Sequence, residues 1–172
     1  MLGFSVDVYD NNIIKKLNEI RNRISYPLPL YREIGLIYFE NTKLRFSSHT
    51  DPQGRIWKHN TNVTKALKRL GFKGRSAAIQ GEYSTGVWTG ALSNAIWIDV
   101  RGNSISVGVL KNSPASLYAQ VFQQGAKKHS LGGKEPWNDI PPRPFLGFNK
   151  KTNDKAMQAI KKYFQDAIEN VK

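Results

Sequence analysis

The chain has 172 residues, 40% apolar and 11% aromatic, a composition typical of one folded domain and not of a disordered chain. It contains no cysteine, which excludes disulfides and thiolate metal sites, and no apolar run near the roughly 20 residues that a membrane span requires. The 26 Lys and Arg residues outnumber the 13 Asp and Glu residues, and the resulting charge of +13 favours a polyanionic partner, either nucleic acid or an acidic protein surface.

The N-terminal stretch is predicted to form a strand. Its apolar residues occupy every second position, which indicates a strand half buried against a core. These residues are Leu2, Phe4, Val6 and Val8. The stretch has neither the basic start nor the long apolar core of a signal peptide, so we expect the protein to be cytosolic when it is made.

Two helices are predicted next. Residues 10–12 offer an N-cap for the first, which ends at Pro27 and Pro29. Its apolar stripe is Ile13, Leu17, Ile20 and Ile24. The second is predicted from about Leu30 to Phe46, with Ile34, Ile37, Tyr38, Asn41 and Leu44 on one side. Because the helices follow one another closely, we expect an αα pair, one end of which projects from the body.

A basic region follows the helices. Residues 51–54, Asp-Pro-Gln-Gly, predict a tight turn, and a short helix is predicted from Thr61 to Leu70. Residues 52–81 contain no acidic side chain. Their basic residues are Arg55, Lys58, Lys65, Lys68, Arg69, Lys73 and Arg75. This set is either a solvated helix and loop or a surface that faces DNA or an acidic partner.

The clearest pattern lies between Thr89 and Gly125. Apolar residues alternate over 96–100 and again over 105–109, and Gly102-Asn103 between them can adopt the positive φ angles of a two-residue turn. This predicts a β-hairpin with one buried face. We expect the following helix, Ala115 to Gln124, to cover that face. Its apolar residues are Leu117, Tyr118, Val121 and Phe122.

Long loops near 71–88 and 126–143 separate the remaining elements. The prolines of 141–144 exclude a helix and a central strand, which leaves an edge strand or an extended arm. Residues 152–154 are expected to cap a last amphipathic helix. Its stripe is Ala156, Ile160, Phe164, Ala167, Ile168 and Val171. The elements together predict a single α+β domain over 1–172, a small, mostly antiparallel sheet with helices packed on it.

The sequence contains no recognisable catalytic or metal-binding motif. The three histidines, His49, His59 and His129, do not have ligand spacing, and the carboxylates are few and scattered. GxSxG, Walker and GxGxxG motifs are absent. The four tryptophans lack the pattern of a base-stacking platform, which favours core or interface positions. We therefore predict no catalytic residue, no metal and no cofactor.

Several short motifs, taken in order, resemble a known family. They are Phe46, the 51–54 turn with Trp57, Thr61 and Lys65, Thr89 to Ile96, Tyr118-Ala119 followed by 122–125, and Ile140 to Gly147. Their order resembles that of the Mu-type phage virion-morphogenesis proteins, also called tail-completion proteins, over roughly 34–171. The chain departs from that pattern at Val121-Phe122, where an Ile-His pair is more usual, and in the loop 73–86.

The resemblance implies a non-enzymatic structural protein of the virion, at the neck or upper end of the tail, that completes the tail and helps to join it to the head. Its expected partners are copies of itself in a ring, most simply a hexamer, the tail tube or terminator protein, the head-closure or connector proteins and the packaged double-stranded DNA, with no membrane. Alternatives are a tail terminator or head-closure protein and, in a different class, a free basic nucleic-acid-binding protein.

Four residues are our candidates for subunit or partner contacts: Trp57, Arg143, Phe145 and Leu146. For Phe145 and Leu146 the alternative is packing in the core of one subunit. A head-to-tail ring would use heterologous contacts, in which the hairpin edge of one copy meets a different edge of the next.

Overall fold

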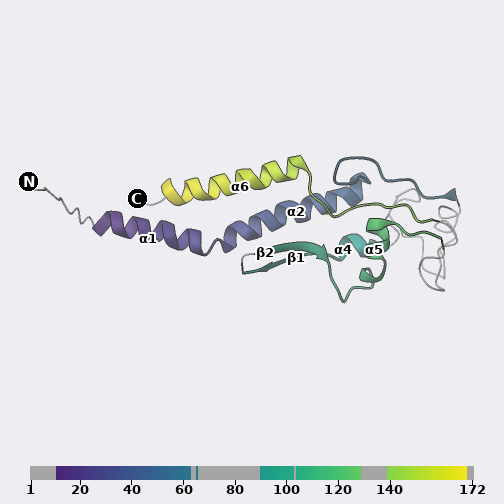
Figure 1. Cartoon of the computed structure of the whole chain (residues 1–172), viewed down its shortest axis with the longest axis horizontal. Coiled ribbons are helices and arrows are strands. Elements are labelled where there is room, and N and C mark those ends of the chain that lie inside the picture. Colours follow the sequence, from purple (N-terminus) through teal and green to yellow (C-terminus); the bar gives the residue numbers. More distant parts are fainter. Residues whose placement is uncertain (1–10, 63–64, 66–89, 103, 129–138, 170–172) are drawn as a thin grey trace, which may run out of the picture.

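The computed structural model describes residues 11–62, 65, 90–102, 104–128 and 139–169 (Figure 1). Its helices are α1 (Asn11–Ser25), α2 (Leu28–Ser48), α4 (Ala91–Asn94), α5 (Ser116–Gln124) and α6 (Lys150–Glu169), and its strands are β1 (Ile96–Arg101) and β2 (Ser104–Val109). The predicted α+β class is confirmed. The predicted N-terminal strand, most of the helix over 61–70, the loop 71–88 and part of the loop 126–143 lie outside the described residues.

The helices α1 and α2 do not form the predicted αα pair. They follow one another almost in line, and α6 runs antiparallel to α2 and reaches α1 (Figure 1). Only Tyr26 and Pro27 separate the two helices, and the Tyr26 N–H still donates to the carbonyl of Asn22 at 3.1 Å. Proline interrupts the hydrogen-bond ladder without reversing the chain, so α1 extends away from the body, as the predicted projecting end does.

The helix α6 begins earlier than predicted, and its buried stripe agrees with the predicted one only at Ala156 and Ala167. Residues 152–154, the predicted cap, lie inside the helix. The cap is Asn149, whose side-chain oxygen accepts the N–H of Thr152 at 2.7 Å. The side chains buried along the helix are small: Thr152, Ala156, Ala159 and Ala167. Such residues let two helices approach closely. The larger Ile168, which the predicted stripe places inside, is 65% exposed.

The predicted hairpin is confirmed. Strands β1 and β2 pair antiparallel from Ile96↔Val109 to Arg101↔Ser104, which leaves Gly102 and Asn103 as the connection. Gly102 has a φ of +52°, in the left-handed region that this turn requires.

The helix that covers the hairpin is α2, and the prediction that the helix over 115–124 covers it is wrong. A Cβ added at Gly35 of α2 would lie 2.9 Å from Cγ2 of Ile98 and 3.2 Å from Cγ2 of Ile105, so helix and hairpin are in close contact. Because α2 packs on the hairpin and also on α6, its predicted single stripe fails, and Leu44 is 61% exposed. The helix α5 packs at the end of the hairpin instead, and its Leu117 is 86% exposed.

The predicted arm over 141–148 is extended, and it lies against its own subunit. An isolated bridge between Ala126 and Ile140 ties the two ends of the preceding loop together, with N–H to carbonyl distances of 2.9 and 2.7 Å. Beyond this bridge the chain passes through the main apolar cluster, where Phe145 is completely buried.

Candidate assembly site

Most of the motifs that carry the family resemblance, though not Thr61 and Lys65, converge at one place, the junction of α2, the 51–57 turn, α4, α5 and the 140–147 segment. All of them contribute residues either to one buried cluster or to the side chains packed against it. Its members are Phe46, Trp57, Leu92, Ala95, Ile96, Ala115 and Phe145, with Phe122 and Leu146 packed against them. Segments distant in the sequence thus form one core, and we call this region the junction.

The aromatic rings of the junction contact one another. The Phe46 ring centroid lies 5.6 Å from that of Trp57, 5.2 Å from that of Phe145 and 6.1 Å from that of Phe122. Trp57 and Phe122 meet edge to face at 5.4 Å. Rings at these separations attract one another beyond the effect of burial, so the junction is a well-specified core.

A buried arginine holds the 145–147 segment against α2. The Nη1 of Arg45 donates to the carbonyl oxygen of Phe145 at 2.6 Å, and its Nη2 donates to that of Gly147 at 2.9 Å and to Oδ1 of Asn41 at 2.7 Å. Burial lowers the pKa of Arg45, and the negative charge of Asp51 partly opposes this effect. No described strand pairs with residues 145–147, so the guanidinium satisfies carbonyls that a neighbouring strand would otherwise satisfy.

A glutamine of α5 holds the same segment from the other side. The Oε1 of Gln123 accepts the N–H groups of Phe145 and Leu146, both at 3.0 Å, and its Nε2 donates to the carbonyl of Leu146 at 3.0 Å. Gln123 thus replaces the strand that an extended segment would otherwise pair with.

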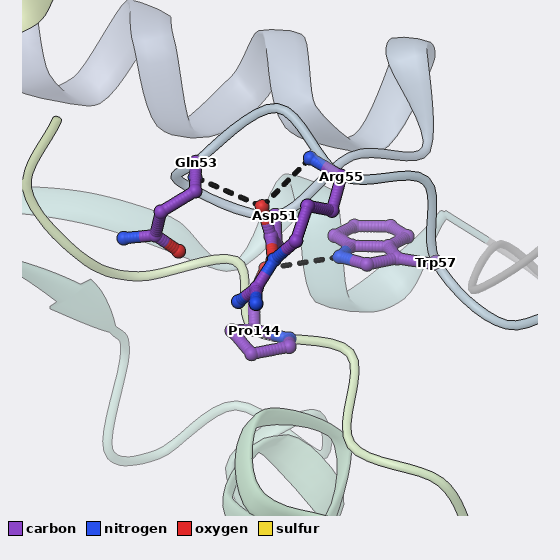
Figure 2. A network of polar contacts seen from close by, with 5 residues as sticks. All are labelled: Asp51, Gln53, Arg55, Trp57 and Pro144. Atoms are coloured by element: carbon purple, nitrogen blue, oxygen red, sulfur yellow. Dashed lines mark hydrogen bonds and ion pairs between the residues drawn. The ribbon is translucent and has the colours of Figure 1, made fainter.

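The turn after α2 is organised by Asp51 (Figure 2). Its Oδ1 accepts the N–H groups of Gln53 and Arg55 at 2.8 and 2.9 Å, and its Oδ2 accepts Nε of Arg55 at 2.6 Å. Burial acts to raise the pKa of Asp51, but the hydrogen bonds from Arg55 and Gln53 and the charge of Arg55 outweigh burial, so the pKa lies below its usual value. The predicted turn over 51–54 is confirmed, with Gly54 N–H donating to the Asp51 carbonyl at 3.0 Å.

Trp57 joins this turn to the 140–147 segment. Its Nε1 donates to the carbonyl of Pro144 at 3.0 Å, as Figure 2 shows, and its ring is buried. Arg143 makes a second link, because its Nε donates to the carbonyl of Lys58 at 3.0 Å while its guanidinium lies over the Phe122 ring. Burial lowers the pKa of Arg143.

The structure brings the four candidate contact residues together. Trp57, Arg143 and Phe145 are buried within the subunit, and Leu146 is half-buried. For Phe145, complete burial agrees with the alternative of packing in the core of one subunit. Any part that they take in subunit contacts is therefore indirect, through the surface that they support, and remains a prediction. Sequence reasoning gave no role to Arg45 or Gln123, because a charged or amide residue beside an apolar helix position is normally solvated.

Three of the seven predicted basic-surface residues are described. Arg55 and Lys58 are exposed and Lys65 is half-buried, whereas Lys68, Arg69, Lys73 and Arg75 lie outside the described residues. Arg55 is not an isolated charge, since it pairs with Asp51. The DNA-facing role of the set remains a prediction.

An apolar groove lies beside the junction. It has a volume of about 510 Å³ and runs between α2, β2 and the 146–148 segment. The residues that line it are Ile34, Tyr38, Thr42, Ile105, Val107, Leu146, Gly147 and Phe148. It contains no acid, base or nucleophile beyond two hydroxyls, so its chemistry suits an apolar segment.

Within the described ranges, no three His, Cys, Asp or Glu side chains lie close enough to hold a metal ion, and no helix is long and apolar enough to cross a membrane.

No curated protein and no solved structure matches the chain. A family model, that of the phage virion morphogenesis family, matches residues 8–165. This match covers most of the chain and confirms the resemblance: the chain belongs to the phage virion morphogenesis family.

Proposed function

We propose that this chain is a structural protein of the phage neck or upper tail end, where copies of it form a ring around the DNA channel, complete the tail and help to join it to the head. Family membership supports a role in building the virion. The proposal assigns no catalysis to the chain and takes a hexamer as the ring, bound to the tail tube or terminator protein on one side and to head-closure or connector proteins on the other.

The observation that carries the proposal is the set of apolar side chains left exposed at separate places on an elongated subunit. On α1, at one end, Leu17 is 60% exposed and Ile14 and Ile24 are also exposed. The helix α5 lies toward the other end (Figure 1), and its Leu117 is 86% exposed. Large apolar patches on a free protein mark contact sites. Exposed apolar side chains on α1 and, separately, on α5 give one subunit two different surfaces, which suits the heterologous contacts that generate a closed ring.

A single charge on α1 tests the ring. In Leu17→Glu, we expect rings to be lost in electron micrographs and the species to sediment as a monomer, because a carboxylate would be buried in the contact. The control is Asn18→Glu, which places the same charge at the next exposed position and leaves Leu17 intact. Rings that form equally well in both variants would contradict a contact through α1.

A map of the virion neck tests the location. Density for this chain between the tube end and the head-closure proteins supports tail completion. Density that caps the tube alone would identify the tail terminator alternative, and density on the portal side would identify head closure.

The net charge of +13 supports contact with packaged DNA as part of this role. If a subunit neutralises about four phosphates, the log–log salt slope of duplex binding would be about −3.6. Tight salt-dependent binding by a chain that never forms rings would favour the alternative of a free nucleic-acid-binding protein. Binding that hardly changes with salt would remove DNA contact from the proposal.

A further inference from the structure

The outer edge of β2 carries backbone groups with no partner in the described part of the chain. The Leu110 N–H donates to the carbonyl of Ala95 at 2.9 Å, so the pair next to Ile96↔Val109 is hydrogen-bonded. Antiparallel pairs alternate between hydrogen-bonded and non-hydrogen-bonded. The N–H and carbonyl groups of Ile105, Val107 and Val109 therefore point away from β1. An edge of this kind is a template for another strand.

The apolar groove lies directly beside this edge. Ile105 and Val107 contribute both to the free edge and to the groove lining, and α2 forms the groove floor with Ile34, Tyr38 and Thr42. At the far rim, Phe148 is 73% exposed although its ring contacts Tyr38 edge to face at 5.5 Å. A strand added to β2 would direct every second side chain toward α2 and into this groove.

We propose that the occupant is the segment Leu2–Tyr9 of a second copy of this chain, which adds to the β2 edge and fills the groove. The segment has the required alternation, with Leu2, Phe4, Val6 and Val8 on one face and Gly3, Ser5, Asp7 and Tyr9 on the other. It lies outside the described residues and directly precedes α1. The inference rests on the proposed function in one respect, that donor and acceptor are neighbours in the ring.

The reach of the segment requires that the donor be another copy. Gly35 of α2 packs on Ile98 and Ile105, in the half of the hairpin nearer its turn, and because α1 and α2 run almost in line, the 24 residue steps from Asn11 to Gly35 span about 36 Å. Residues 1–10, fully extended, reach at most about 33–36 Å. Within its own subunit the segment would end about level with Gly35, near the start of β2, and could not run along Ile105 to Val109.

Cross-linking between full-length chains tests the inference, and the chain offers a clean background because it has no cysteine. The donor variant is Ser5→Cys. The acceptor variant is Ser106→Cys, an exposed β2 position between Ile105 and Val107. Both sit on the polar face, and neighbouring strands keep such positions within about 8 Å even if the register shifts by two residues. The acceptor carries a tag that makes it larger than the donor, and a bismaleimide of short reach is the cross-linker. We expect a donor–acceptor heterodimer on a denaturing gel.

Two control variants sharpen the test. Ser47→Cys, an exposed serine near the end of α2, should give no heterodimer with the donor. In the acceptor, Val107→Pro removes an outward N–H that β1 does not use, so the hairpin persists while cross-linking falls at least tenfold. Val107→Ala keeps the N–H, so cross-linking should fall less in this variant than in Val107→Pro.

The outcomes separate this inference from the proposed function. Rings that form without the heterodimer, or a Ser5→Cys/Ser106→Cys double variant that cross-links only within one chain, would overturn strand donation and leave the ring intact. Absence of both rings and heterodimers, with and without the tail partner, would overturn both proposals.

Discussion

The side chain of Arg45 is hydrogen-bonded to the backbone of Phe145. The guanidinium donates to the Phe145 carbonyl at 2.6 Å, and the Phe145 ring packs on Phe46 with 5.2 Å between the ring centroids. The residue is thus fixed at both its polar and its apolar group. Among the described residues, no strand pairs with 141–147, and this double attachment explains how an extended stretch can cross the core of a small domain.

The first prediction concerns this attachment. Arg45→Met keeps much of the apolar volume but leaves the Phe145 and Gly147 carbonyls without donors, and an unsatisfied buried group costs about 1–3 kcal/mol. We expect the free energy of unfolding, measured by urea denaturation, to fall by about 2–4 kcal/mol. The control Arg32→Met, on the exposed side of the same helix, should change it by less than about 0.5 kcal/mol. Equal effects would show that the carbonyl contacts contribute nothing specific.

The neighbouring glutamines of α5 provide a second, matched test. Gln123→Ala removes the acceptor for two N–H groups of the 145–146 segment, whereas Gln124→Ala removes an exposed side chain. We expect Gln123→Ala to lower the free energy of unfolding by about 2–5 kcal/mol and Gln124→Ala by less than about 0.5 kcal/mol. Amide hydrogen exchange should accelerate at Phe145 and Leu146 in the first variant alone; unchanged protection there would refute the assignment.

The hairpin and most helices of this fold are predictable from the sequence, because alternation and helical spacing depend on neighbouring residues. Which elements pack against one another is harder to predict from the sequence. No pattern of neighbouring residues indicates that α2 at Gly35 packs on the hairpin, or that the apolar face of α5 does not. The contact depends on the space that Gly35 leaves because it has no side chain. Arg45 and Gln123 were missed for a related reason: their role arises only when a segment some hundred or twenty residues away is laid beside them.

A third prediction uses the close approach at the end of α5. A Cβ added at Gly125, where φ is +76°, would lie 2.6 Å from the Ile140 carbonyl oxygen and 2.8 Å from the Pro142 nitrogen, both backbone atoms. Gly125→Ala should therefore separate the two ends of the loop and lower the free energy of unfolding by about 2 kcal/mol or more. Gly108→Ala, with no atom within 4 Å of the new Cβ, should be tolerated within about 1 kcal/mol. A Gly125→Ala variant as stable as Gly108→Ala would contradict the geometry.

The last prediction concerns acid stability and Asp51. Its pKa is lower in the folded chain than in the unfolded chain, where it is about 3.9. As the pH falls, the unfolded state binds the proton first, so the stabilisation is complete at neutral pH, declines below about pH 5 and is lost once the pH passes below the folded pKa.

Asp51→Asn should remove that dependence. We expect the free energy of unfolding to be lower by about 1–2 kcal/mol at pH 7, because a charged acceptor and its pair with Arg55 are lost and Arg55 itself is largely solvated. The difference between the two proteins should then shrink steadily from pH 5 to pH 3. Asp154→Asn, at an exposed position of α6, serves as the control and should shift the curve by less than about 0.5 kcal/mol at either pH. Parallel curves for Asp51→Asn and the parent chain would mean that the carboxylate charge is not what holds the turn.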